Sequence, residues 1–169
     1  DIDKNVLKTL LSPLPPLLLA TYSLGFLSPH TGIGADHHCP SDWYSFDKFC
    51  YKFIKQWKSW NDAEASCARL QDSSHLASIH SQVEIFRVQK VIFMNTVLYD
   101  DVWIGLSDPW NNRTWIWTDG SELDYTSWVS EEPSNVDEWD SCVLLSSSSR
   151  YRKWKAAPCE SNNYFICKM

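Results

Sequence analysis

Hydrophobic positions recur at helical spacing in two segments of the chain. In the first segment, Ala63, Cys67 and Leu70 follow one another at intervals of four and three residues. Residues at these intervals lie on one face of an α-helix. Ser59, with Asp62 three positions later, resembles a capping box and marks the start of this helix. The pattern predicts a helix that begins near Ser59 and buries one face.

The second segment repeats this arrangement. Ser81 is followed three positions later by Glu84, and Ile85, Val88 and Ile92 then fall on one helical face. A second amphipathic helix is predicted from Ser81 onward.

Short apolar runs separated by turns predict strands. The aromatic-rich run 43–53 contains Asp47-Lys48 and is typical of a hairpin with a turn at that pair. The further candidates are Val102 to Leu106, Thr114 to Trp117, Cys142 to Leu145 and Tyr164 to Cys167. Two early helices followed by many short strands favour an α+β fold. Residues 107–140 are rich in turns, and a loop of this length is usually functional or has a structure of its own.

Composition and charge narrow the class of protein. The chain has 169 residues and a formal net charge of -6, which disfavours binding to nucleic acid or anionic lipid. Apolar residues make up 44% of the chain and 10 are Trp, so disorder of the whole chain is excluded. The length fits one domain with a tail.

Residues 1–35 differ in composition from the rest of the chain. They contain four Pro and an apolar run behind Lys4 and Lys8, and they have no Cys or Trp. A membrane-spanning helix needs about 20 apolar residues without helix-breaking Pro. The segment is therefore interpreted as a signal peptide or part of a leader, and a misjoined translation or a disordered tail are the alternatives. The folded domain is expected to be 36–169.

The six cysteines form no Cys-x-x-Cys pair, which argues against a zinc ribbon or a thioredoxin-like site. They occupy positions 39, 50, 67, 142, 159 and 167. An even number of cysteines is typical of three disulfides in an oxidising compartment. Six reduced, buried thiols are the alternative.

Several motifs together resemble the C-type lectin-like domain family. In order they are Cys39-Pro40-Ser41-Asp42-Trp43, Cys50-Tyr51-Lys52, Trp60-x-x-Ala63-Glu64-x-x-Cys67, His75-Leu76-Ala77-Ser78-Ile79, Val102-Trp103-Ile104-Gly105-Leu106, Trp117-Thr118-Asp119-Gly120-Ser121 and Phe165-Ile166-Cys167. The resemblance covers residues 39–168. It implies two helices, two small antiparallel sheets, a long structured loop and three disulfides.

Within the family, two segments look most like the snake-venom C-type lectin-like proteins (snaclecs). These are the opening Cys-Pro-Ser-Asp-Trp and Tyr151-Arg152-Lys153-Trp154. The resemblance implies the disulfide pairs Cys39–Cys50, Cys67–Cys167 and Cys142–Cys159. In the chain-entropy description, closing the loop between Cys67 and Cys167 contributes roughly 4–5 kcal/mol.

The resemblance also locates a sugar and calcium site, whose ligands are altered here. Sugar-binding members use a Glu-Pro-Asn motif, a carboxylate before the next Cys and a Trp-Asn-Asp motif. The corresponding positions hold Glu132, Ser134, Asp140, Lys155 and Ala156. Calcium requires 6–8 oxygen ligands, several of them anionic. An ammonium and a methyl group at two of these positions predict that Ca²⁺ binds poorly and that Glu132 and Asp140 pair with Lys155 or Arg152 instead.

A second calcium site of venom members corresponds to Ser78, His80, Glu84 and Lys168. Two of these four positions have lost an anionic ligand. Lys168 is expected to place its ammonium where the ion would lie and to pair with Glu84. No metal and no cofactor are therefore expected.

The long loop and the segment after it carry opposite charges. Acidic residues gather at 131–140, including Glu131 and Glu138, and basic residues including Arg152 follow at 150–155. Such runs are either solvated faces or a recognition surface. Trp139 is the candidate for an exposed anchor, because Trp is enriched at binding hot spots, whereas Trp128 is expected to anchor the loop in the core.

Other chemistry is sparse. The five His residues are scattered, and the sequence shows no nucleophile–base constellation and no phosphate-binding glycine loop. Asn112-Arg113-Thr114 is an N-glycosylation sequon. Since the chain lacks the extra cysteine that seals venom heterodimers, a monomer or a non-covalent oligomer is expected.

The sequence thus predicts a secreted, extracellular, non-enzymatic binding protein. The venom-like resemblance implies a protein target such as a platelet receptor or plasma clotting factor, and hence a toxin that affects haemostasis. Calcium-dependent carbohydrate binding is the alternative, and Lys155 and Ala156 argue against it. A hydrolytic enzyme is disfavoured by the missing triad.

Overall fold

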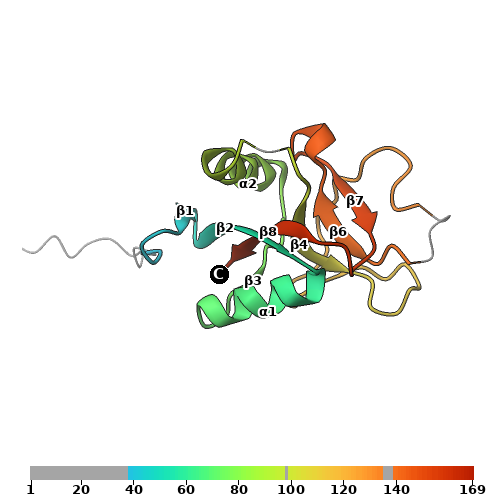
Figure 1. The fold of residues 1–169 in the computed structure, drawn as a ribbon, viewed down its shortest axis with the longest axis horizontal. Coiled ribbons are helices and arrows are strands. Elements are labelled where there is room, and N and C mark those ends of the chain that lie inside the picture. The colour runs from blue at the N-terminus through green and yellow to red at the C-terminus, as the bar shows by residue number, and fades with distance from the viewer. Residues whose placement is uncertain (1–37, 98, 135–138) are drawn as a thin grey trace, which may run out of the picture. The chain divides into compact units, whose positions relative to one another are not determined.

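The computed structural model describes residues 38–97, 99–134 and 139–169 (Figure 1). The leader expected at 1–35 and the binding-surface candidate Glu138 lie outside these residues. The domain boundary at residue 36 therefore stays a prediction.

The chain enters the domain through a hairpin. Strand β1 (Tyr44–Phe46) pairs antiparallel with β2 (Phe49–Lys58). Asp47 adopts a left-handed conformation in the turn, with φ at 53°, which Asp tolerates better than most residues. The hairpin predicted from the aromatic run is confirmed.

Both helices begin where the capping patterns placed them. Helix α1 (Trp60–Leu70) follows Ser59, whose hydroxyl accepts a hydrogen bond from the Asp62 backbone N–H. Helix α2 (Gln82–Asn95) follows Ser81, which accepts from Glu84 N–H at 3.1 Å. Each cap satisfies one of the backbone donors that a helix start leaves unpaired.

The remaining strands complete one sheet. They are β3 (His75–Leu76), β4 (Val102–Ser107), β5 (Ile116–Trp117), β6 (Cys142–Leu145), β7 (Trp154–Ala157) and β8 (Asn163–Lys168). The strand order is β1-β2-β8-β4-β6-β7, with β3 on β8 and β5 on β4.

The resemblance implied two small antiparallel sheets, and the structure joins their strands into one. Strand β4 pairs in parallel with β8 on one side and antiparallel with β6 on the other. It therefore joins the strands of both halves into one hydrogen-bonded sheet. The α+β C-type lectin-like fold with two helices is confirmed.

The sheet is covered on both sides. Figure 1 shows α1 along one side of the central strands and α2 along the other. On the α2 side, Ile85 and Ile92 pack in a cluster with Ile104 of β4. On the α1 side, Ala63 and Cys67 lie in a cluster with Trp103. Alternate residues of β4 thus serve opposite clusters, as the period of a strand requires, and all six residues of this strand are buried.

All three disulfides implied by the resemblance are present. Cys39–Cys50 closes the hairpin, Cys67–Cys167 joins α1 to β8, and Cys142–Cys159 joins the start of β6 to the segment after β7. No helix among the described residues is long and apolar enough to cross a membrane.

Candidate functional site

The glutamate of the altered sugar site is hydrogen-bonded to the backbone. Glu132 precedes a cis bond to Pro133. Its Oε2 atom accepts from Ser134 N at 3.1 Å and from Ala156 N at 3.3 Å. The carboxylate thereby ties the long loop to strand β7, and the Ser134 carbonyl accepts from the Arg113 guanidinium.

Lys155 forms an ion pair that the sequence did not indicate. Its Nζ atom lies 2.7 Å from Asp101 Oδ2. The other oxygen of Asp101 accepts from Ser147 N and Oγ, both at 2.8 Å. Glu132 and Asp140 were expected to pair with Lys155 or Arg152. The ion pair that Lys155 makes is with Asp101, which directly precedes β4.

The donor set does not fit Ca²⁺. Ala156 offers only a methyl group, and Lys155 carries an ammonium, paired with Asp101, instead of an oxygen ligand. The Glu132 oxygen that would be a ligand already accepts two backbone hydrogen bonds. Among the described residues of the site, the remaining side-chain oxygens are Glu132 Oε1 and those of Ser134 and the partly buried Asp140. These described oxygens alone are too few for an ion that prefers 6–8 oxygen ligands.

A second network lies where β8 meets the start of α2. Lys168 Nζ is 2.7 Å from Glu84 Oε1 and 3.1 Å from both the carbonyl and the hydroxyl oxygen of Ser78. Both charged side chains are buried, at 4% and 7% exposure. The pairing expected between Lys168 and Glu84 is present in the structure.

Tyr51 completes the surroundings of Glu84. Its hydroxyl donates to Glu84 Oε1 at 2.5 Å. Burial, together with the neighbouring Glu84 carboxylate, raises the pKa of Tyr51 above its usual range. Glu84 Oε2 accepts from His80 N at 2.7 Å. The carboxylate therefore receives three hydrogen bonds, which compensate for the cost of burying it.

Two carboxylates join this network from a distant segment. Asp119 Oδ2 accepts from Ser78 Oγ at 2.5 Å, and Asp124 Oδ1 lies 2.7 Å from His80 Nδ1. Loss of water contact would raise the pKa of Asp119, but hydrogen bonds from Ser121 and Ser78 outweigh it and hold the pKa below its usual range. The hydrogen bond to His80 lowers the pKa of Asp124.

Asp119 and Asp124 were not among the residues predicted for this site from the sequence. Asp119 belongs to a motif quoted for the resemblance, but only the folded chain brings it to Ser78.

Ser78, His80 and Asp124 form a chain of hydrogen bonds that resembles a catalytic triad. His80 Nε2 lies 3.1 Å from Ser78 Oγ. However, Ser78 is fully buried, its hydroxyl donates to Asp119, and it accepts from Lys168. Its proton is thus directed to a carboxylate, and its side chain has no exposed surface. The hydrogen bonds tie three segments of the chain together.

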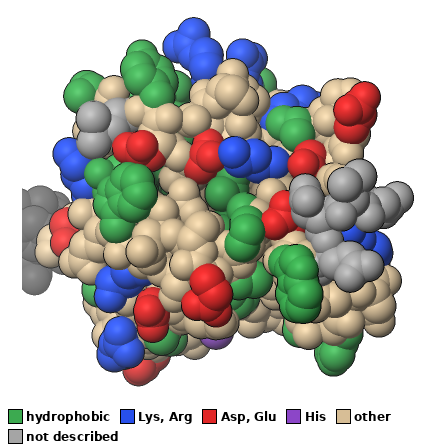
Figure 2. Space-filling model, turned by 45° about the vertical axis from the view of Figure 1, so that its right-hand side comes forward, with side chains coloured by type: hydrophobic (Ala, Val, Ile, Leu, Met, Phe, Trp, Pro, Cys, Tyr) green, Lys and Arg blue, Asp and Glu red, His purple; other side chains and the backbone are tan. Residues whose placement is uncertain are grey.

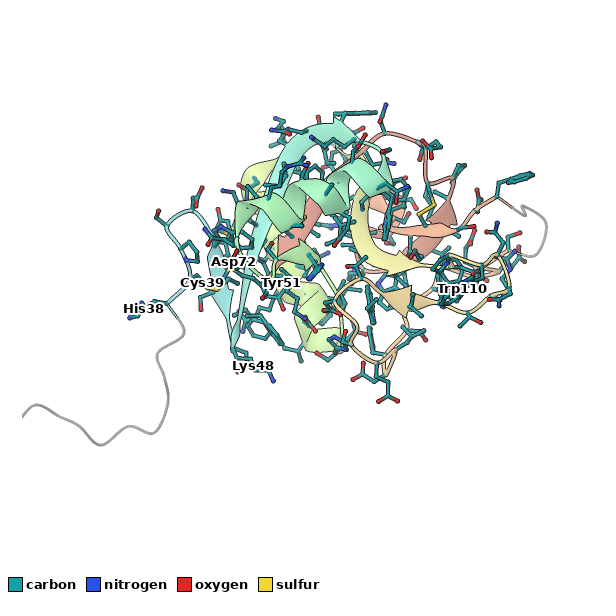
Figure 3. All side chains as sticks on the ribbon, turned by 90° about the horizontal axis from the view of Figure 1, so that it is seen from below. His38, Cys39, Lys48, Tyr51, Asp72 and Trp110 are labelled. Carbon is teal, nitrogen blue, oxygen red and sulfur yellow. A yellow bond between two sulfur atoms is a disulfide. The ribbon has the colours of Figure 1, made fainter. Side chains whose placement is uncertain are left out.

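Most of the surface candidates belong to the long loop, whereas Arg152 lies beside α2. Trp139 is 78% exposed and Trp110 is 63% exposed, and Figure 3 shows Trp110 on the opposite side of the domain from His38 and Lys48. Glu131, Arg152 and the sequon residue Asn112 are also exposed. Trp128, in contrast, is half-buried against the core, with its ring 5.7 Å from that of Trp154.

This fold and these site positions define a C-type lectin domain. The Lectin C-type domain family matches residues 56–169, and the chain belongs to this family. The chain is 54% identical over 138 residues to C-type lectin lectoxin-Lei1 of Leioheterodon madagascariensis, covering 82% of this chain and 88% of that protein. It is 41% identical over 130 residues to a C-type lectin mannose-binding isoform of Notechis scutatus scutatus, covering 77% and 82%. These snake relatives agree with the resemblance seen in the sequence.

Solved structures agree on the fold. Human lithostathine superposes with a TM-score of 0.74 at 37% identity, over 78% of this chain and 98% of that chain. A calcium-independent type II antifreeze protein superposes with a TM-score of 0.68 at 30% identity, over 78% and 94%.

Proposed function

We propose that this chain is a secreted, non-enzymatic C-type lectin-like protein that binds a protein target without calcium. The observation that carries this proposal is the state of the sugar-site residues. Lys155 is paired with Asp101, and Glu132 is hydrogen-bonded to backbone N–H groups. The venom-like resemblance favours a haemostatic target such as a platelet receptor or clotting factor, with the action of a toxin.

Calcium-dependent sugar binding is the competing function. One relative is described as mannose-binding, and the chain retains Glu132 and Asp140. Asn112 lies on an exposed turn. A glycan linked to it is compatible with either function.

Thermal unfolding in millimolar Ca²⁺ and in EDTA separates the two functions. A ligand at a hundredfold excess over its Kd stabilises the folded protein by about 2.7 kcal/mol, which corresponds to a rise in Tm of several degrees for a chain of this size. We expect equal Tm values in both buffers and no retention on immobilised mannose. A higher Tm in Ca²⁺, or elution from mannose by EDTA, would establish the competing function.

The protein target is tested with immobilised protein in EDTA. Washed platelets and citrated plasma are passed over it, before and after enzymatic removal of their N-glycans. Binding that survives deglycosylation supports a protein epitope. Binding that disappears with the glycans contradicts the proposal.

A further inference from the structure

A groove of about 490 Å³ lies between α2 and the segment that follows the short helix Ser147–Ser149. Its lining comes from two places in the chain. These residues are Gln89, Lys90, Phe93, Met94, Arg150 and Arg152. It is separate from the altered sugar site and from the Lys168 network.

The groove is positively charged although the chain is acidic. Lys90, Arg150 and Arg152 line it and are exposed, and no carboxylate lines it. Within the part of the chain that the structure describes, none of the three forms an ion pair. Figure 2 shows basic and hydrophobic side chains next to one another along the upper edge, the level at which Figure 1 places α2. The groove thus offers unpaired positive charge to an anionic ligand.

The groove also offers apolar surface. Phe93 and Met94 are 37% and 55% exposed. The Arg150 guanidinium lies 5.7 Å from the centre of the Phe93 ring. Met side chains adapt readily to the shape of a ligand. A purely anionic ligand would leave this apolar surface in contact with water.

Contacts within the domain hold the groove in shape. Gln89 Nε2 donates to the Arg150 carbonyl at 2.5 Å. The buried Tyr151 ring packs edge-on against Phe93 at 5.3 Å. Ser149 Oγ accepts from the backbone N–H groups of Arg152 and Lys153. A site that is ordered before binding loses less entropy when a ligand enters.

We infer that this groove binds an acidic protein segment that carries large apolar side chains. The inference rests on the proposed protein-binding function and names the surface and the chemistry of the target. Carboxylates would pair with the three cations, and an apolar side chain would cover Phe93 and Met94. The apolar part favours a peptide over a sulfated polysaccharide, which has charge but no large apolar groups.

Fluorescence anisotropy of synthetic peptides tests this site. The probe is a labelled peptide of Glu, Asp, Leu and Phe. Two comparison peptides replace either the apolar residues by Gly or the acidic residues by Lys. The variant Lys90→Glu/Arg152→Glu reverses two groove charges, and Lys55→Glu/Arg69→Glu makes the same charge change at exposed residues outside the groove.

We expect only the acidic, apolar peptide to bind, with a Kd that rises with salt concentration. Reversal of the groove charges should weaken the binding of this peptide by about tenfold or more, since interfacial charge pairs contribute strongly when partly desolvated. The control variant should bind within about twofold of the parent. Equal loss in both variants, or equal binding of the Gly-containing peptide, would overturn the inference.

Two further outcomes separate this inference from the proposed function. If heparin displaces the peptide and itself binds more tightly, the groove is a site for sulfated glycans and the peptide assignment fails. If no peptide binds while platelet or plasma binding in EDTA persists after deglycosylation, the proposed function stands and the groove assignment fails.

Discussion

Lys168 and Glu84 meet at 2.7 Å inside the domain although 84 positions separate them in the chain. The contact joins the last strand to the first turn of α2. A buried charge without its partner is strongly unfavourable, whereas an exposed ion pair contributes little. The pair therefore couples the last strand of the domain to the start of α2.

Lys168→Met should lower the free energy of unfolding by about 3–5 kcal/mol, because it leaves the Glu84 carboxylate buried without a counter-charge. Urea denaturation measures this loss. Adding Glu84→Gln to the same chain should recover part of it. Lys52→Met is the matched control, because the partly buried Lys52 pairs with the exposed Asp42, and its loss should cost no more than about 1 kcal/mol. Equal losses for Lys168→Met and Lys52→Met would contradict the account.

Substitution of the two glycines in the described domain should lower the free energy of unfolding by different amounts. A Cβ atom at Gly105 would lie 2.5 Å from the Leu76 carbonyl oxygen, which belongs to the backbone. Gly105→Ala should therefore destabilise the fold by about 3 kcal/mol or more, at the upper end for an overpacked core.

At position 120, glycine is favoured by the backbone conformation and not by a lack of space. It has φ of +74° and open space around it, so Gly120→Ala should cost about 1 kcal/mol. Gly120→Asn should be nearly neutral, because Asn tolerates the left-handed region. Thermal unfolding of the three variants tests both statements, and a fully stable Gly105→Ala protein would be incompatible with the close approach.

Local signals explain what the sequence could predict. Ser59 and Ser81 cap their helices through residues three positions away, so the pattern alone located both starts. Strand β7 was not predicted. Its sequence from Trp154 to Ala157 has only four residues and alternates over only the first three, and the strand pairs with β6.

Long-range partners explain what the sequence could not predict in the site. Lys168 was expected to meet Glu84 only because the family resemblance aligned the two positions. No such guide indicated Asp101 for Lys155 or Asp124 for His80, because exposed or partly buried acids of the same charge occur throughout the chain. Which acidic residue pairs with Lys155 or His80 depends on which turn the fold brings next to that side chain.

Acid should weaken the contact between Asp119 and Ser78. The pKa of Asp119 is lowered in the folded protein, whereas an unfolded Asp titrates near 3.9. Between these two values the unfolded chain binds more protons, so stability rises with pH. The contribution is thus complete above about pH 4 and is lost as the pH falls through the folded pKa.

Urea midpoints measured from acid to neutral pH should show this dependence. Asp119→Asn should flatten the profile in the acid range, since its amide cannot titrate. Asp72→Asn, at an exposed position on the turn after α1, should leave the shape of the profile unchanged. A parent-like acid slope in Asp119→Asn would show that other groups control it.

Restoring the lost ligands should create a calcium site. Ser134→Asn, Lys155→Asn and Ala156→Asp together supply three side-chain oxygens and remove the ammonium without a change in loop length. Removing Lys155 also frees Asp101 from its ion pair, a loss that is small because the Lys155 side chain is 39% exposed. We expect the triple variant to gain a Tm that rises with Ca²⁺ and to be retained on mannose until EDTA is added.

The single variant Lys155→Asn is the control for this experiment. It removes the positive charge but leaves Ala156 without an oxygen, and a site for 6–8 oxygen ligands remains incomplete. It should therefore respond to Ca²⁺ no more than the parent does. If Lys155→Asn alone restored calcium-dependent retention, the Lys155 ammonium would be the only feature that prevents Ca²⁺ binding. The Glu132 carboxylate would then have to give up its backbone hydrogen bonds to bind the ion. If the triple variant gained nothing, those hydrogen bonds from Ser134 and Ala156 would hold the loop in an arrangement that cannot surround an ion.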